Sequence, residues 1–217
     1  VSSSDAFGNI CHVLTLDMPH REIRIRAMGI VETDDGERTS VAGGDPLPYL
    51  RSTALTAISP DLAAFAEGFR KQPMTQEALL ALAQGIEMAV EFSPGSTHVG
   101  STAADAFAAG LGVCQDHTHI FLSCCRYLGV PARYVSGYVH SPGHASNHMA
   151  THAWAEAWLH DRWWSFDQLR GKPRPSGRGR IARTPQASFS SPQCGVCCCS
   201  MYWRITEIGA PPQLPAK

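Results

Sequence analysis

Cys114 stands at the start of a predicted helix, where a thiol gains nucleophilic character. The run Gly110-Leu111-Gly112-Val113 precedes it, and the helix is predicted to continue to about Leu128. Free N–H groups and the positive end of the helix dipole stabilise a thiolate at this position and lower its pKa. The same N–H groups can hold the oxyanion of a tetrahedral intermediate. Gly110 and Gly112 are small, and we expect them to let a substrate backbone approach.

An imidazole and a carboxylate are predicted to lie together on a β-hairpin. Residues 151–159 and 163–167 read as its two strands, and His160-Asp161 as its turn. This register places His152 diagonally across from Asp167 on one face. Diagonal neighbours are about 7–8 Å apart at the backbone, within reach of a His–Asp hydrogen bond. The sequence therefore permits a Cys–His–Asp triad, in which a base activates the thiol and a third group orients the base.

Other elements must position these residues. Ser59, Thr75 and the pair Ser101-Thr102 are expected to cap three helices that pack without chemistry of their own. Residues 133–139 read as a strand, and residues 10–16 and 22–27 as an N-terminal hairpin.

The predicted helix after Gly112 has an apolar stripe. The stripe is expected to face the core and consists of Cys114, Thr118, Phe121, Cys125 and Leu128. Cys124 and Cys125 are interpreted as packing residues on this helix.

Several short motifs, in this order, carry a family resemblance. They are Gly112-Val113-Cys114-Gln115-Asp116, Arg126-Tyr127-Leu128-Gly129-Val130-Pro131-Ala132-Arg133, Tyr134-Val135-Ser136-Gly137-Tyr138, His152-Ala153-Trp154 and Phe166-Asp167. Together they resemble the bacterial transglutaminase-like superfamily, which has a papain-like cysteine-protease core. The resemblance covers roughly residues 5–167.

The resemblance implies an α+β fold, with the nucleophile at the N-terminus of a helix packed on an antiparallel sheet. By analogy Cys114 is the nucleophile, His152 the general base and acid, and Asp167 the residue that orients His152. The implied reaction is cysteine-dependent amide chemistry on a peptide or protein, through a thioester and without a metal or organic cofactor. Water would then give hydrolysis and an amine would give transamidation. We favour peptidase or amidase activity.

The chain is expected to contain four segments. Residues 1–33 resemble the end of the family's N-terminal β region, whose first half is missing, and residues 34–58 read as a linker. Residues 59–170 form the expected catalytic core. Residues 171–217 form a basic, cysteine-containing tail that departs from the family pattern. We expect this tail to be disordered or to be read from a shifted frame, which resequencing the coding DNA would decide.

Composition and charge exclude several classes of function. The 217 residues are 44% hydrophobic and 17% charged, as in soluble globular proteins, and no apolar run approaches the roughly 18–20 residues needed to span a membrane. Residues 1–167 carry 10 basic and 18 acidic residues, a net charge of −8, whereas residues 168–217 carry +7. An acidic body disfavours nucleic acid as a partner. The cysteine spacing shows no disulfide framework, which favours reduced thiols and a cytoplasmic location.

Other interpretations of the same residues remain open. Cys114 alone could be a small core residue, and the tryptophans of the hairpin could line a cleft or fill the core. The spacing of His140, His144, His148 and His152 invites a metal site, but Pro142 and Gly143 break any helix there. Cys194 and Cys197 have the spacing of half a zinc site. The leading functional alternative is a catalytically inactive domain of the same fold that binds a partner or has a structural role.

Overall fold

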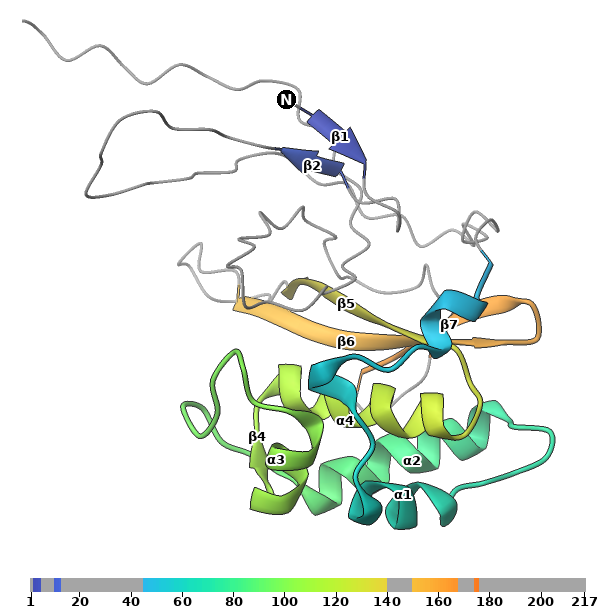
Figure 1. Ribbon diagram of the computed structural model, residues 1–217, viewed down its shortest axis with the longest axis horizontal. Helices are drawn as coiled ribbons and strands as arrows, with labels where there is room; N and C mark the ends of the chain where they lie inside the picture. The colour runs from blue at the N-terminus through green and yellow to red at the C-terminus, as the bar shows by residue number, and fades with distance from the viewer. Residues whose placement is uncertain (1, 5–9, 13–44, 140–149, 168–173, 176–217) are drawn as a thin grey trace, which may run out of the picture.

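The computed structural model describes residues 2–4, 10–12, 45–139, 150–167 and 174–175. Four α-helices lie on one side of an antiparallel sheet, and this segregation of layers is an α+β architecture (Figure 1). The expected fold class is therefore confirmed. The histidines at 140, 144 and 148, the cysteines from 194 onward and almost all of the basic tail lie outside the described residues.

Three helices begin at the predicted caps. Helix α1 (Pro60–Glu67) begins after Ser59, whose hydroxyl accepts the backbone N–H of Leu62, and α2 (Gln76–Ala89) begins after Thr75, which accepts that of Ala78. Helix α3 (Ala103–Ala109) begins after Thr102 and ends at Gly110, whose φ of 65° is left-handed. Local capping chemistry was thus sufficient to predict these boundaries.

Helix α4 (Cys114–Tyr127) is the centre of the molecule. It contacts α1, α2, α3 and strands β5 and β6, and every residue from Asp116 to Cys125 is buried. The prediction of a single core-facing stripe was therefore too narrow, because neighbours surround this helix instead of covering one face. The polar side chains along it, such as His117 and Ser123, are buried as well.

The principal sheet has the order β5-β6-β7-β8, and Figure 1 labels its strands β5, β6 and β7. Its strands are β5 (Ala132–Val139), β6 (Ala150–Leu159), β7 (Arg162–Phe166) and β8 (Arg174–Pro175). Strands β6 and β7 form the predicted hairpin with Leu159 opposite Arg162. His160 and Asp161 both have positive φ, 50° and 59°, as a two-residue type I′ turn requires. The predicted register is confirmed.

Side chains alternate across this sheet, so its two faces differ. Ala153, Ala155, Ala157 and Phe166 belong to the hydrophobic core shared with α4. The opposite face carries Glu156, which is buried and accepts hydrogen bonds from Arg133 at 2.6 and 2.8 Å.

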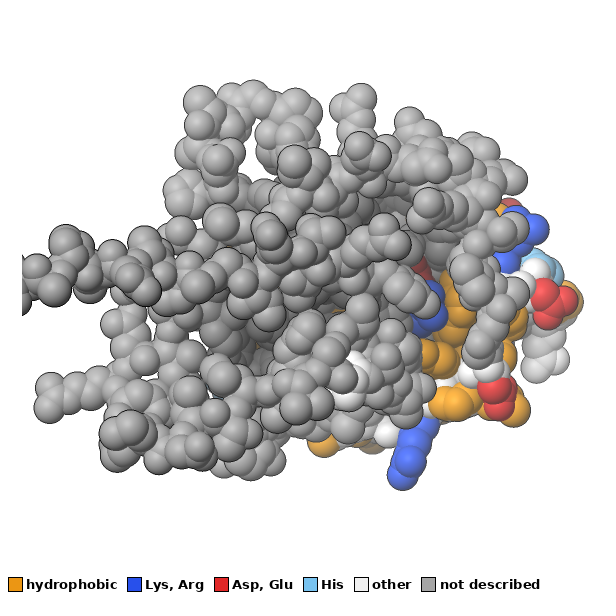
Figure 2. Space-filling model, turned by 90° about the horizontal axis from the view of Figure 1, so that it is seen from above, with side chains coloured by type: hydrophobic (Ala, Val, Ile, Leu, Met, Phe, Trp, Pro, Cys, Tyr) orange, Lys and Arg blue, Asp and Glu red, His pale blue; other side chains and the backbone are white. Residues whose placement is uncertain are grey.

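Part of the expected linker packs against the core. Residues Leu47–Leu50 form the 3-10 helix η1, and Ala54–Thr56 form η2. The guanidinium of Arg126, near the end of α4, donates to the carbonyl oxygen of Tyr49 at 3.1 Å and to the hydroxyl of Thr56 at 2.6 Å. Seen from above relative to Figure 1, the described side chains at one end of the molecule are a mixture of hydrophobic and charged ones (Figure 2).

Two small strand pairs complete the described structure. Strands β1 (Ser2–Ser4) and β2 (Ile10–His12) are antiparallel, whereas β3 (Glu91–Phe92) and β4 (Leu111–Gly112) are parallel. The predicted hairpin of residues 10–16 and 22–27 lies outside the described residues except for β2. In the tail, β8 pairs with β7.

Candidate active site

Cys114 is the first residue of α4. Gly112 in β4 pairs with Phe92 in β3, and Val113 is the N-cap residue between strand and helix. The strand pair therefore fixes the point at which the chain enters the helix. Cys114 is half-buried and stands at the positive end of the helix dipole.

His152 and Asp167 meet across the β6–β7 hairpin as the register predicted. The ring nitrogen Nε2 of His152 lies 2.9 Å from Oδ2 of Asp167, and only 10% and 11% of the two side chains are exposed. A carboxylate at Nε2 orients the ring and leaves Nδ1 for another partner.

The same imidazole is a hydrogen-bond partner of the Cys114 thiol. Burial by itself raises the pKa of Cys114, but hydrogen bonds from the His152 side chain and from the backbone of Ala153 and Gln115 outweigh burial and lower it. Burial lowers the pKa of His152, whereas its hydrogen bonds and attraction to Asp167 and Cys114 raise it to about 9. These opposite shifts favour a thiolate–imidazolium pair.

Trp154 supports the imidazole from the same strand. Its ring stacks on that of His152 with centroids 6.1 Å apart and an interplanar angle of 24°, and the Trp154 side chain is 2% exposed. Of the two roles open to this tryptophan, packing is the one its burial supports.

Gly112, two residues before Cys114, has a different role from the expected one. A Cβ atom at Gly112 would lie 2.8 Å from Cβ of Asp116. Gly112 therefore leaves room for the Asp116 side chain, whereas we expected it to leave room for a substrate backbone.

Comparisons with known proteins agree with this geometry. Residues 63–168 match the model of the transglutaminase-like superfamily. This region of the chain is a transglutaminase-like domain. The domain contains α2, α3, α4 and the strands β3 to β7, so all three candidate residues lie within it.

The transglutaminase-like domain also has relatives of known sequence and structure. An uncharacterized protein of Mycobacterium leprae is 32% identical over 147 residues, which cover 63% of this chain and 53% of the relative. One from Mycobacterium tuberculosis is 30% identical over 157 residues, covering 64% and 50%. A crystal structure of a "putative cysteine protease" from Cytophaga hutchinsonii is 28% identical, with a TM-score of 0.51 over 68% of this chain and 51% of that one. The chain spans about half the length of the curated relatives it matches.

The other cysteines of α4 in the transglutaminase-like domain have a different environment. Burial raises the pKa of Cys124 to about 12 and also raises that of Cys125 well above its usual value. Both belong to the hydrophobic core, so their interpretation as packing residues is confirmed. Within the described residues, no group of three or more His, Cys, Asp or Glu could hold a metal ion, and no helix is long and apolar enough to cross a membrane.

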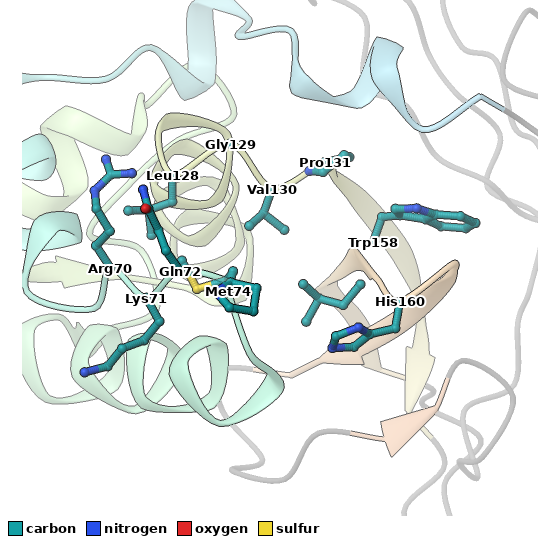
Figure 3. Close-up of a pocket in the computed structure, with 12 residues that line it drawn as sticks. Arg70, Lys71, Gln72, Met74, Leu128, Gly129, Val130, Pro131, Trp158 and His160 are labelled. Atoms are coloured by element: carbon teal, nitrogen blue, oxygen red, sulfur yellow. The ribbon is translucent and has the colours of Figure 1, made fainter.

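A cavity of about 360 Å³ lies at the other end of α4 (Figure 3). Its lining includes Met74, Leu128, Val130, Trp158 and His160. Since α4 has 14 residues, its two ends are about 20 Å apart, and this cavity is separate from Cys114.

Thr97 is a residue of the site that sequence reasoning missed. Its hydroxyl donates to Oδ2 of Asp116 at 2.6 Å. The two residues are 19 positions apart and belong to no shared motif or periodic pattern, so the sequence offered no signal for their contact.

Proposed function

We propose that this transglutaminase-like domain catalyses amide-bond chemistry through a thioester on Cys114. The observation that carries the proposal is the position of His152, whose Nε2 lies 2.9 Å from Asp167 while the same ring hydrogen bonds to the Cys114 thiol. A nucleophile, a base and an orienting group in this order are sufficient for acyl transfer. Acid, base and nucleophile are all side chains, so the proposed chemistry needs no metal or organic cofactor.

In the first step the Cys114 thiolate attacks the carbonyl carbon of a peptide or protein amide. The carbonyl π electrons move to oxygen, which gives a tetrahedral oxyanion at the N-terminus of α4. The His152 imidazolium then gives a proton to the amide nitrogen. The C–N bond breaks, an amine leaves, and the acyl group remains on sulfur as a thioester.

In the second step a nucleophile attacks the thioester. His152 is now neutral and takes a proton from water or from an incoming amine, while Asp167 stabilises the imidazolium that forms. Collapse of the second tetrahedral intermediate returns the thiolate. Water gives a carboxylic acid and an amine gives a new amide.

We favour hydrolysis as the principal outcome. The similarity to a protein described as a cysteine protease supports this preference. The substrate class of peptide or protein amides belongs to the same proposal, and a cytoplasmic location stays a prediction from the cysteine pattern.

The test uses denatured casein with and without monodansylcadaverine, a fluorescent primary amine. Hydrolysis produces new peptide N-termini that mass spectrometry can count, whereas transamidation attaches the fluorophore to casein. We expect new N-termini from the native chain and none from Cys114→Ala. Cys124→Ala, which removes a buried thiol from the same helix, should keep the activity.

Three results would contradict the proposal. One is activity of Cys114→Ala equal to that of the native chain. Another is loss of activity in both cysteine variants to the same degree. The third is the absence of products together with ordinary, slow alkylation of Cys114, which would favour the inactive binding domain.

A further inference from the structure

Asp116 is a buried carboxylate next to the nucleophile, and the proposed steps do not use it. The residue is fully buried, two positions after Cys114 in the first turn of α4. Its Oδ2 accepts the backbone N–H of Val113 at 2.8 Å and the hydroxyl of Thr97 at 2.6 Å. Its Oδ1 has no hydrogen-bond partner among the described residues. A buried charge with an unsatisfied oxygen is costly, which suggests a role beyond stability.

Helix α3 shows what ordinary capping in this chain looks like. There Asp105 accepts the backbone N–H of Thr102 at 3.1 Å and its hydroxyl at 2.7 Å, and these contacts are exposed. In α4 the N-cap residue is Val113, which has no hydroxyl. The hydroxyl comes instead from Thr97, in the loop that follows β3. The cap of α4 is thus a tertiary contact, whereas that of α3 is local.

The Asp116 contacts, together with those of His117, hold the residue whose carbonyl group forms the peptide bond to Cys114. While its carboxylate holds the Val113 N–H, its own backbone N–H donates to the Val113 carbonyl oxygen at 2.9 Å. Val113 is therefore held at both its N–H and its carbonyl group. Gly112 on the other side is fixed by Ser93, whose N–H donates to the Gly112 carbonyl oxygen at 2.9 Å.

The position of the Asp116 side chain also depends on the absence of a side chain at Gly112. Because a Cβ at Gly112 would lie 2.8 Å from Cβ of Asp116, the aspartate side chain fills the space that the glycine leaves. The strand end, the loop residue Thr97 and the first helical turn are therefore packed against each other at the nucleophile.

We propose that Asp116 is a positioning residue for Cys114 and that Thr97 fixes its carboxylate. Together they hold the turn from Gly112 to Cys114 so that the sulfur stays against His152 and the Cys114 N–H stays directed at the oxyanion. This inference rests on the proposed function, because it assigns the Asp116–Thr97 pair to the geometry of that nucleophile.

The test compares Thr97→Val with Thr102→Val. Both remove a threonine hydroxyl that donates to an aspartate, but only the first acts on the helix that carries Cys114. The measurement is the rate of iodoacetamide alkylation at Cys114 from pH 5 to 10, with thermal unfolding of each variant. We expect Thr97→Val to slow alkylation at pH 6 about tenfold and to move its pH profile toward that of a free thiol. Thr102→Val should lower stability without moving the profile.

Two more variants refine the result. Thr97→Ser restores the hydroxyl and should restore the native profile. Asp116→Asn keeps the side-chain shape but removes its charge, and we expect it to slow alkylation at least as much as Thr97→Val.

The outcomes separate this inference from the proposed function. If native Cys114 reacts fast and Thr97→Val leaves its profile unchanged, Asp116 has only a structural role and the inference is overturned. The same holds if Thr97→Val and Thr102→Val move the profile equally. If native Cys114 itself reacts like an ordinary thiol, the proposed function fails and the inference fails with it.

Discussion

Helix α4 carries three cysteines, and its two ends place them in opposite environments. At the N-terminus Cys114 is half-buried, and hydrogen bonds to its sulfur lower its pKa below that of a free thiol. About three turns later Cys124 and Cys125 are fully buried among apolar side chains, and burial raises the pKa of Cys124 to about 12. Cysteine thus has two roles on one helix: it is a candidate nucleophile at the N-terminus and a core residue near the C-terminus.

The difference comes from what each end of the helix offers to a negative charge. The first turn has the backbone N–H of Gln115 beside the sulfur, the positive end of the dipole and the imidazole of His152, all of which stabilise a thiolate. The last turns offer Cys125 no neighbour that overcomes the cost of desolvation. Reactivity in this protein is therefore a property of position in the tertiary structure, and cysteine content alone does not predict it.

The largest expected effect is a contrast in labelling between the two ends. At pH 6 we expect iodoacetamide to modify Cys114 at least about 100-fold faster than Cys124 or Cys125 in the native chain, because only a thiolate reacts. Fragmentation of labelled peptides by mass spectrometry assigns each site. Equal alkylation rates at the three cysteines would contradict the expected difference between the two ends of α4.

Removing the imidazole should give the next largest effect. His152→Gln takes away both the hydrogen bond to sulfur and the positive charge, so we expect alkylation of Cys114 at pH 6 to slow about 30-fold. The control is His160→Asn in the hairpin turn, since asparagine tolerates the positive φ of that position. If alkylation of Cys114 slows as much in His160→Asn as in His152→Gln, the effect is not specific to the Cys114–His152 pair.

Replacing Asp167 should weaken the same pair through His152. The hydrogen bond to Asp167 is the largest cause that raises the pKa of His152, so Asp167→Asn lowers this pKa from about 9 toward its usual value near 6.5. We expect alkylation at pH 6 to slow about tenfold, which corresponds to about 1.4 kcal/mol.

The same substitution changes how stability depends on pH. A histidine with a raised folded-state pKa contributes stability that is complete below its unfolded pKa and is lost as pH rises through about 9. In a Cys114→Ala background, which removes the thiol titration and leaves Asp167 to raise the His152 pKa, the unfolding free energy should still fall as the pH rises above 6 through that raised pKa. It should fall less, by on the order of 1 kcal/mol, when Asp167→Asn is also present. Parallel pH curves would contradict the raised pKa.

The smallest expected effect is at the packed end of the helix. Cys125→Ala leaves a small cavity in the core and should lower the unfolding free energy by about 1 kcal/mol. Denaturant unfolding measures this cost. The alkylation rate of Cys114 should stay unchanged, and a changed rate would mean that the two ends are coupled.

Local rules were sufficient wherever neighbouring residues fix the backbone. Ser59 and Thr75 predicted two helix starts because their hydroxyls satisfy N–H groups a few positions away. The His160-Asp161 turn predicted the register of the hairpin, and that register predicted the approach of His152 to Asp167. Each of these contacts depends on short separations and on the two-residue period of strands.

Prediction failed where distant segments decide the environment. The burial of α4 on all sides follows from the helices and strands packed around it, and its sequence alone predicted one core face. Residues 47–56 have the composition of a linker, yet the hydrogen bonds of Arg126 attach them to the core. The position of Gly112 just before Cys114 indicated access for a substrate backbone. The sequence alone does not show that the Asp116 side chain fills the space beside this glycine.

The sequence by itself determined the types of reactive group, their order and the hairpin register that joins His152 to Asp167, because these depend on residue identity and local geometry. Only the tertiary structure decided how these groups are held. It packed α4 against β6, so that the Cys114 sulfur meets the His152 ring. It also brought Thr97 to Asp116 across 19 residues. Such contacts form when the whole core packs, and no short-range rule encodes them.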